Sequence, residues 1–384
     1  MVERVFTETD ILQWRKEFPI LGEYIHLANC SQSAQSLRVR AALETYLNNW
    51  RTDGMDWDYW VEEACRAKAE FARLIGADPD EIFLSSSVTE AVASIASSLP
   101  LDGPRKKIVT TAMEFPTVGH IWLAHQKYGY DLTFLPLEGE NIPLESYSAG
   151  IDEDTLLVSA THVYYRNGYK QDLSALAKIC HEKGALLLID AYQGLGTEPV
   201  NVREQQIDIL TSGCIKYLFG VPGIAFTYVR RDLIPQLRPA LTGWFGQENP
   251  FSFEVDKLDY ACDARRFDTG TPPVINAFAA TAALSLANEI GVDRIAQRID
   301  LLSKTALDTC DELGLTTVSP RDIRRKGGTT AIQVEGDTHV LEQKLKERHV
   351  IASARGNVIR FAPHFYTLPE ELIEALHILR DLTE

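Results

Sequence analysis

The segment Ala185–Asp190 has the sequence ALLLID, the most apolar short run of the chain, and it ends in a carboxylate. A continuous apolar run of this length is typical of a strand buried on both faces of a parallel sheet. Around it, helical patterns (Thr89–Leu99, Leu173–Lys183) alternate with further short apolar runs (Lys107–Ala112, Asp131–Leu135, Thr155–Ala160, Ile207–Thr211, Ile224–Val229). This alternation predicts an α/β fold, with a mainly parallel sheet covered by helices on both faces.

The pattern changes after Asn288. An amphipathic stretch at Val292–Leu313 predicts a long helix. It is followed by short apolar runs that predict strands (Thr329–Val334, Val350–Ser353, Val358–Phe361) and by further helical patterns (Asp337–Arg348, Pro369–Leu382). The 384 residues are enough for two domains. We therefore expect a large domain over residues 76–285 and a smaller α+β C-terminal domain over residues 286–384. Residues 1–75, with helices at Leu37–Trp50 and Trp60–Ile75, are expected to pack with the small domain.

Composition and charge exclude several classes of protein. Hydrophobic residues make up 45% of the chain and charged residues 24%, which is typical of a globular protein. The 54 acidic and 38 basic residues give a net charge of −16, which repels nucleic acid. Six scattered cysteines without a CxxC pair favour a reduced, cytoplasmic protein with no metal site. The N-terminal stretch MVERVFTETD shows no secretory signal.

One uncharged segment, Thr269–Asn288, is long enough to cross a bilayer by its length alone. It contains Pro272-Pro273, Asn276 and Ser285, however, together with several alanines. These residues favour a helix buried in the core or in a subunit interface, and we expect no membrane contact.

Three weak signals follow the predicted strands, where open α/β sheets bind ligands. Ser85–Glu90 follows an apolar run and would place hydroxyls and free N–H groups at a helix N-terminus, an anion cradle. The same residues could be a simple capping box, Ser87 with Glu90. Asp190 is a carboxylate that is costly to bury without a partner. Lys216 lies among apolar residues, where desolvation lowers the pKa of an amine and suits it to form a Schiff base.

Together the three signals suit pyridoxal 5'-phosphate. Its aldehyde needs a lysine, its ring nitrogen a carboxylate and its phosphate an anion cradle. In addition, seven motifs resemble, in order, the aminotransferase class V family of fold-type I pyridoxal phosphate enzymes, in particular its kynureninase and isopenicillin-epimerase-like branch. They are Glu114-Phe115-Pro116-Thr117, Thr161-His162-Val163, Asp190-Ala191-Tyr192-Gln193, Lys216-Tyr217-Leu218, Gly243-Trp244-Phe245-Gly246, Gly270-Thr271-Pro272-Pro273 and Arg360–Tyr366.

The resemblance implies a role for each candidate residue around the cofactor. Lys216 would bind the aldehyde and move protons, and Asp190 would pair with the ring nitrogen. Gln193 would lie near the phenolic oxygen, and Phe115 would stack on the ring. The phosphate would be bound by Val88 and Thr89, with help from Ser212.

The resemblance also implies a homodimer with shared active sites. Thr271 and Trp244 would reach the phosphate bound by the neighbouring subunit. Arg360 would bind the α-carboxylate of an amino acid substrate in a bidentate fork, with Arg355 as the weaker candidate for the same role. A structural ion pair is the competing interpretation of Arg360.

Departures from the family pattern bear on the reaction. Cysteine desulfurases of this family use a mobile cysteine in a loop after an Arg-Gly motif, but here Arg355-Gly356-Asn357 leads directly into the last predicted strand and no cysteine follows Cys310. Persulfide transfer is therefore not expected. Gln193 and Gln247 stand where kynureninases have histidines, which argues against kynurenine hydrolysis.

We therefore expect a pyridoxal phosphate-dependent enzyme that acts on a small α-amino acid by transamination or by lyase chemistry at Cβ. An epimerase or racemase of the same family and a non-catalytic protein of the same fold are the alternatives. A nicotinamide dehydrogenase would suit the α/β pattern, but the chain lacks GxGxxG after the first strand.

Overall fold

A seven-stranded sheet forms the centre of the molecule in the computed structural model, which describes residues 5–384. Its order is β2-β8-β7-β6-β5-β3-β4. The strands are β2 (Ile82–Ser85), β3 (Lys107–Thr111), β4 (Asp131–Leu135), β5 (Thr155–Thr161), β6 (Leu186–Asp190), β7 (Ile209–Gly213) and β8 (Ala225–Val229). Only β8 runs antiparallel to its neighbours, β2 and β7. The predicted α/β fold with a mainly parallel sheet is confirmed.

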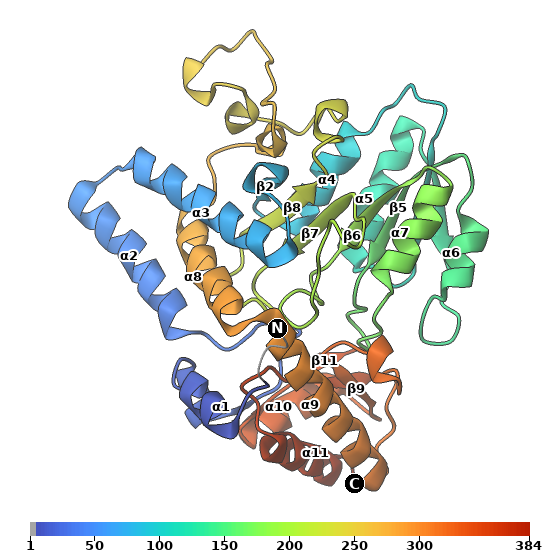
Figure 1. Cartoon of the computed structure of the whole chain (residues 1–384). Helices are drawn as coiled ribbons and strands as arrows, with labels where there is room; N and C mark the ends of the chain where they lie inside the picture. The colour runs from blue at the N-terminus through green and yellow to red at the C-terminus, as the bar shows by residue number, and fades with distance from the viewer. Residues whose placement is uncertain (1–4) are drawn as a thin grey trace.

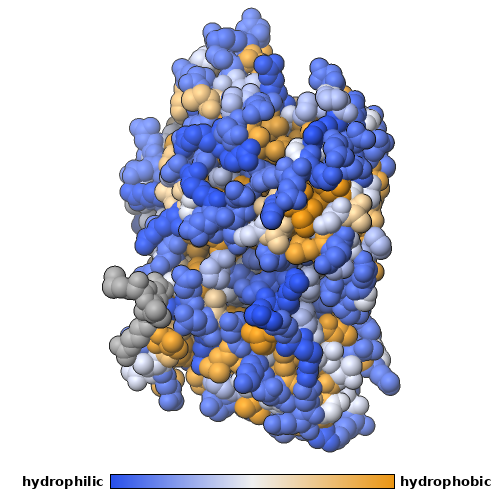
Figure 2. All heavy atoms as spheres, turned by 45° about the vertical axis from the view of Figure 1, so that its right-hand side comes forward, coloured by the Kyte–Doolittle hydropathy of each residue, from blue (hydrophilic) through white to orange (hydrophobic). Residues whose placement is uncertain are grey.

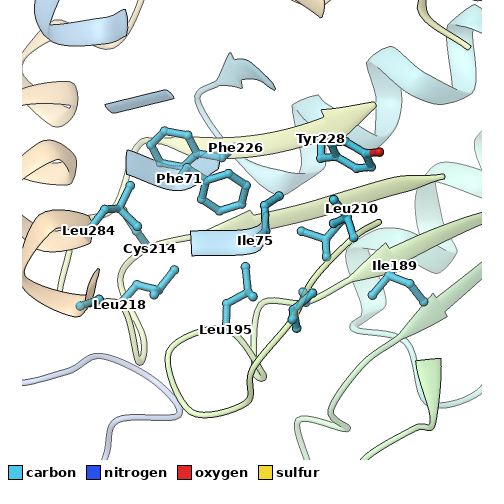
Figure 3. Close-up of a cluster of buried hydrophobic side chains, with 14 of the residues drawn as sticks. Phe71, Ile75, Ile189, Leu195, Leu210, Cys214, Leu218, Phe226, Tyr228 and Leu284 are labelled. Atoms are coloured by element: carbon cyan, nitrogen blue, oxygen red, sulfur yellow. The ribbon is translucent and has the colours of Figure 1, made fainter. Parts of the chain in front are cut away.

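Helices cover both faces of this sheet, so its strands are apolar on both sides. One face packs against α3 (Trp57–Ile75), α6 (Leu144–Gly150), α7 (Leu173–Glu182) and α8 (Val274–Ile290). The other packs against α4 (Val88–Ser98) and α5 (Pro116–His125). Figure 3 shows part of the first layer, where Phe71 of α3 stacks on Phe226 of β8 with ring centroids 4.8 Å apart.

A second, smaller group of elements lies below the large sheet in Figure 1. It contains the antiparallel sheet β11-β12-β9 and the helices around it. Its elements are α9 (Val292–Glu312), β9 (Thr330–Gln333), α10 (Thr338–Glu347), β10 (Val350–Ile351), β11 (Ser353–Arg355), β12 (Val358–Phe361) and α11 (Pro369–Thr383). The expected strand at Val350–Ser353 is thus divided, because β10 pairs with β1 whereas β11 pairs with β12.

The N-terminal part of the chain is shared between the two groups. The strand β1 (Ile25–His26) runs parallel to β10, and Arg15 at the end of α1 (Glu8–Arg15) forms an ion pair with Glu371 of α11 at 2.6 Å. The helices α2 (Leu37–Asp53) and α3, which we expected to pack with the small domain, lie against α8 instead (Figure 1). The reason is the apolar face of α3, which fits the large sheet. Residues 1–4 of the expected N-terminal segment lie outside the described residues.

The uncharged segment forms most of α8, and most of its apolar side chains are buried. No single helix within residues 5–384 is long and apolar enough to cross a bilayer, although α8 and α9 pass that test as a pair bent by 74°. On the face shown in Figure 2, hydrophilic side chains cover most of the surface and apolar ones gather in its hollows.

Candidate active site

A cavity of about 340 Å³ lies at the carboxyl ends of β5 and β6, beside the segment that follows β7 and the N-terminus of α4. The register of the parallel strands places the last residues of β5 and β6 side by side, Thr161 next to Asp190. The cavity is lined by Ser86, Ser87, Val88, Thr89, Phe115, Thr117, Thr161, Val163, Tyr165, Asp190, Tyr192, Gln193, Ile215, Lys216 and Pro222–Ile224. Six of the predicted site residues, distant in sequence, therefore share one cavity.

At the N-terminus of α4 only one half of the capping box forms, and free N–H groups remain beside it. Ser87 caps the helix by accepting from the Glu90 N–H at 3.2 Å, and Glu90 in turn accepts from the Ser86 N–H at 2.8 Å. The N–H groups of Val88 and Thr89 occupy the first two helical positions and have no partner within residues 5–384. Free N–H groups at a helix N-terminus are a site for an anion.

Lys216 lines the cavity and forms no ion pair within residues 5–384. Its Nζ lies 4.2 Å from the ring centroid of Tyr192 and 5.8 Å from that of Phe115. Burial lowers the pKa of this amine to about 8, although the nearby Asp190 partly opposes the shift. A buried lysine with a lowered pKa is available as a neutral amine at mildly alkaline pH.

Asp190 ends β6 with a buried side chain. Its Oδ1 accepts from the Tyr192 N–H at 2.9 Å, and its Oδ2 forms no hydrogen bond within the described residues. Burial raises the pKa of this carboxyl, while the Tyr192 N–H and Lys216 act in the opposite direction. Gln193 donates from Nε2 to the carbonyl of Cys30 at 3.0 Å, and its buried Oε1 has no hydrogen-bond partner among the described residues.

Arg360 of β12 is fully buried at the back of this site. Its Nη1 donates to the carbonyl oxygen of Tyr165, a cavity residue, at 2.7 Å. Its Nη2 donates to Ser353 at 2.6 Å and to Ser31 at 3.1 Å. Arg360 forms no ion pair in the part of the chain that the structure describes, so the competing interpretation, a structural ion pair, is not supported.

Besides Arg360, four predicted residues do not line the cavity. Ser212 lies inside β7, which extends two residues beyond the strand expected at Ile207–Thr211, and its hydroxyl donates to the Gly213 carbonyl at 2.8 Å. The prediction that it helps to bind the phosphate is therefore not supported. Arg355 is exposed at the end of β11. Trp244 packs edge-on against Trp57. Thr271 is exposed and lines a separate pocket, which it shares with Ser86 and Glu90.

Several residues of the site were not found from the sequence. Tyr192 and Tyr165 lie within or just after quoted motifs, but nothing in the sequence marked their rings as cavity walls. Gly213 is part of this arrangement, because a side chain there would overlap the ring and hydroxyl of Tyr192. Ser31 and Ser353, the partners of Arg360, belong to no recognisable motif.

The residues present fit pyridoxal phosphate. The free N–H groups of Val88 and Thr89 suit its phosphate, the free Oδ2 of Asp190 suits its ring nitrogen, and the unpaired Nζ of Lys216 suits its aldehyde. Each of these groups is buried or lines the cavity, and each lacks a partner within residues 5–384.

Comparisons with known proteins agree with this geometry. The family model for aminotransferase class-V matches residues 29–361. The chain is 42% identical to the uncharacterized aminotransferase YcbU of Bacillus subtilis, over 95% of this chain and 96% of that protein. It is 27% identical to a kynureninase of Geobacillus thermodenitrificans, over 98% and 92% of the two chains.

The fold has solved counterparts. The structure of a cysteine desulfurase from Thermococcus onnurineus superposes with a TM-score of 0.88 at 24% identity and covers 99% of both chains. The cystine C-S lyase C-DES superposes with a TM-score of 0.87 at 19% identity, over 95% of this chain and 99% of that one. At these identities the likeness concerns the fold. The match of the family model over most of the chain shows that this protein belongs to the aminotransferase class V family of enzymes, whose cofactor is pyridoxal 5'-phosphate.

Proposed function

We propose that this enzyme acts on a small α-amino acid, by transamination or by lyase chemistry at Cβ. The observation that carries the proposal is that two cations, neither of which forms an ion pair within residues 5–384, lie around one cavity. Lys216 is a half-buried amine that lines the cavity, and Arg360 is a buried guanidinium that donates to a residue lining it. An α-amino acid bound at the cofactor presents one carboxylate, which Arg360 would bind. The 42% identity to a protein named as an aminotransferase supports the first reaction type.

The residues of the site have separate tasks in this proposal. When bound, pyridoxal phosphate supplies an aldehyde that links covalently to amines and a ring that withdraws electrons from Cα. The N–H groups of Val88 and Thr89 donate to its phosphate, and Asp190 holds a proton at the ring nitrogen. The Nζ of Lys216, with its pKa lowered to about 8, takes a proton at Cα and returns it.

The walls of the cavity orient and shield the reacting groups. The ring of Phe115 is 44% exposed and forms one wall, where it can stack on the cofactor. Tyr165 meets Phe115 edge-on, with centroids 5.3 Å apart, and closes the cavity toward Arg360. Gln193 retains an unpaired Oε1 and a second N–H near the cavity.

We further propose that the enzyme works as a homodimer with shared sites. Trp244 and Thr271 do not reach the cavity of their own chain, which leaves them free to serve a neighbour. Around Trp244 lies an exposed apolar patch that includes Phe251 and Phe253, with 52% and 70% of their surfaces exposed. An exposed patch of this kind is typical of a protein–protein interface. A second copy of the chain is the proposed occupant.

The covalent assignment is tested by reducing the holoenzyme with borohydride and mapping its peptides. The pyridoxyl group is expected on Lys216, and an adduct on Lys170 or Lys257 would refute the proposed site. The reaction type is tested next with a panel of amino acids. Release of a keto acid together with conversion of the cofactor to its amine form identifies transamination. Release of the substituent at Cβ identifies a lyase. Formation of the opposite enantiomer without other products identifies a racemase.

A further inference from the structure

The hydrogen bonds of Arg360 are unusual for a buried cation. Its side chain is 1% exposed, yet its three acceptors are all neutral: the Tyr165 carbonyl and the hydroxyls of Ser31 and Ser353. Its Nε is buried and has no hydrogen-bond partner within residues 5–384. A buried charge is costly without a counter-charge, so this arrangement is suited to receive an anion.

A guanidinium can present two parallel N–H groups to one carboxylate in two ways. One fork uses Nη1 and Nη2, and the other uses Nε and Nη2. Both forks therefore need a hydrogen of Nη2. In the structure Nη2 donates to two hydroxyls that lie only 2.7 Å apart, those of Ser353 at 2.6 Å and Ser31 at 3.1 Å. A carboxylate oxygen that approaches this side of Nη2 competes with these two hydroxyls.

The two serines differ in how firmly they are held. Ser353 is buried and lies directly opposite Arg360 in the β11–β12 ladder. Ser31 lies on the segment between β1 and α2, is half-buried and makes the longer bond. Its Oγ is also 2.7 Å from the Ser353 Oγ, so it keeps a partner when it leaves Arg360. A carboxylate forms a stronger, charge-assisted bond and would displace the neutral hydroxyl.

We propose that the Ser31 hydroxyl occupies the place of one substrate carboxylate oxygen on Arg360 and leaves when the amino acid binds. Ser353 stays and orients the guanidinium. This inference rests on the proposed function, because it assumes that Arg360 binds the α-carboxylate. Ser31 then lowers the affinity for the substrate by competing with it, and Ser353 raises that affinity.

The test is a titration of the holoenzyme with glycine, in which binding is monitored through the absorbance of the cofactor. Glycinamide, which lacks a carboxylate, is the matched probe. Ser31→Ala removes the competitor and is expected to lower the apparent Kd for glycine about three- to tenfold. Ser353→Ala is expected to raise it about tenfold, because the guanidinium loses its orientation. Neither change should alter the response to glycinamide.

The control variant is Ser33→Ala. It lies on the same segment, but its hydroxyl is 3.4 Å from the Ile215 carbonyl and does not contact Arg360, so its Kd should match that of the parent enzyme. If Ser31→Ala fails to bind cofactor, Ser31→Gly takes its place. An unchanged or raised Kd in the Ser31 variant overturns the displacement. Equal responses of the parent enzyme to glycine and glycinamide, including none to either, overturn instead the carboxylate role of Arg360 in the proposed function.

Discussion

Two residues of the cavity have pKa values that are shifted in the direction that favours the neutral form of each side chain. Burial lowers the pKa of Lys216 to about 8 and raises that of Asp190. Two groups of opposite charge would normally stabilise each other in their charged forms. Here desolvation outweighs that attraction, and a bound cofactor would supply partners for both groups.

The shift of Lys216 makes a prediction about the stability of the apoenzyme. Below pH 8 this amine is protonated in both the folded and the unfolded state, so the cost of burying its charge is fully present. Between pH 8 and 10.5 the unfolded state binds more protons, and stability contributed by this group rises with pH. Lys216→Met should therefore raise the urea midpoint of the apoenzyme at pH 7, and the gain should shrink at pH 10. An equal gain at both values would contradict the shift.

Arg360 carries a prediction about affinity. A charge-assisted hydrogen bond contributes on the order of 1.5–3 kcal/mol, so losing a bidentate pair should weaken amino acid binding by at least about a hundredfold. Arg360→Lys should be nearly as damaging as Arg360→Ala, because an ammonium cannot form the fork. Cofactor absorbance should persist in both. The matched control is Arg355→Ala, since Arg355 is exposed. If this control loses affinity and the Arg360 variants do not, the carboxylate binds to Arg355.

At the scale of elements, short turns decide which groups meet. The hairpin β11–β12 has only Gly356 and Asn357 between its strands, so no mobile loop with a cysteine exists there. The turn after β6 brings Gly196 against the segment of Lys216. Gly196 has a φ of +96°, and a side chain there would overlap the carbonyl oxygen of Tyr217.

This close approach predicts the effect of a matched pair of substitutions. Gly129 has a similar φ of +90° but open space around it. Gly129→Ala should cost about 1–2 kcal/mol from the backbone alone. Gly196→Ala adds an overlap with main-chain atoms and should cost roughly 3 kcal/mol or more. It should also weaken cofactor binding, because Tyr217 follows Lys216. Thermal unfolding and cofactor titration measure both effects, and equal costs would show that the contact does not matter.

At the scale of the whole molecule, the proposed shared sites predict complementation between two inactive chains. Lys216→Ala removes the covalent attachment, whereas Thr271→Asp places a negative charge where the neighbour's phosphate is expected. In a mixed dimer, Lys216 of one chain and Thr271 of the other together make one intact site. After co-expression, borohydride reduction should therefore attach the cofactor covalently to the protein. Neither variant expressed alone should show this attachment.

Sedimentation gives the direct measurement of assembly. The parent enzyme should be a dimer at micromolar concentration, because the aromatic patch around Trp244 needs to be covered. As a control, Phe134→Ser changes an exposed aromatic residue on β4, away from the patch, and should leave the dimer intact. A stable monomer with full cofactor affinity would rule out the shared-site model.

Sequence patterns alone predicted the α/β class and most strands of the large sheet, and they marked Lys216 and Asp190, which the structure places at one cavity. Such patterns are local: apolar runs mark buried strands, and a charged residue after such a run is conspicuous. The boundary of β7 was wrong by two residues, because its end is set by pairing with β8 and not by its own composition. Ser212 lies in this extension of β7 and does not line the cavity.

The environment of Arg360 was decided only by the tertiary structure. Its three partners come from residue 31, residue 165 and residue 353, and nothing local in the sequence links them. The packing of α2 and α3 on α8 was likewise decided by the fit of apolar faces, which sequence order does not encode. Local sequence patterns thus predict where strands lie and which charged residues follow them. The partners of those residues depend instead on contacts between segments that are hundreds of residues apart.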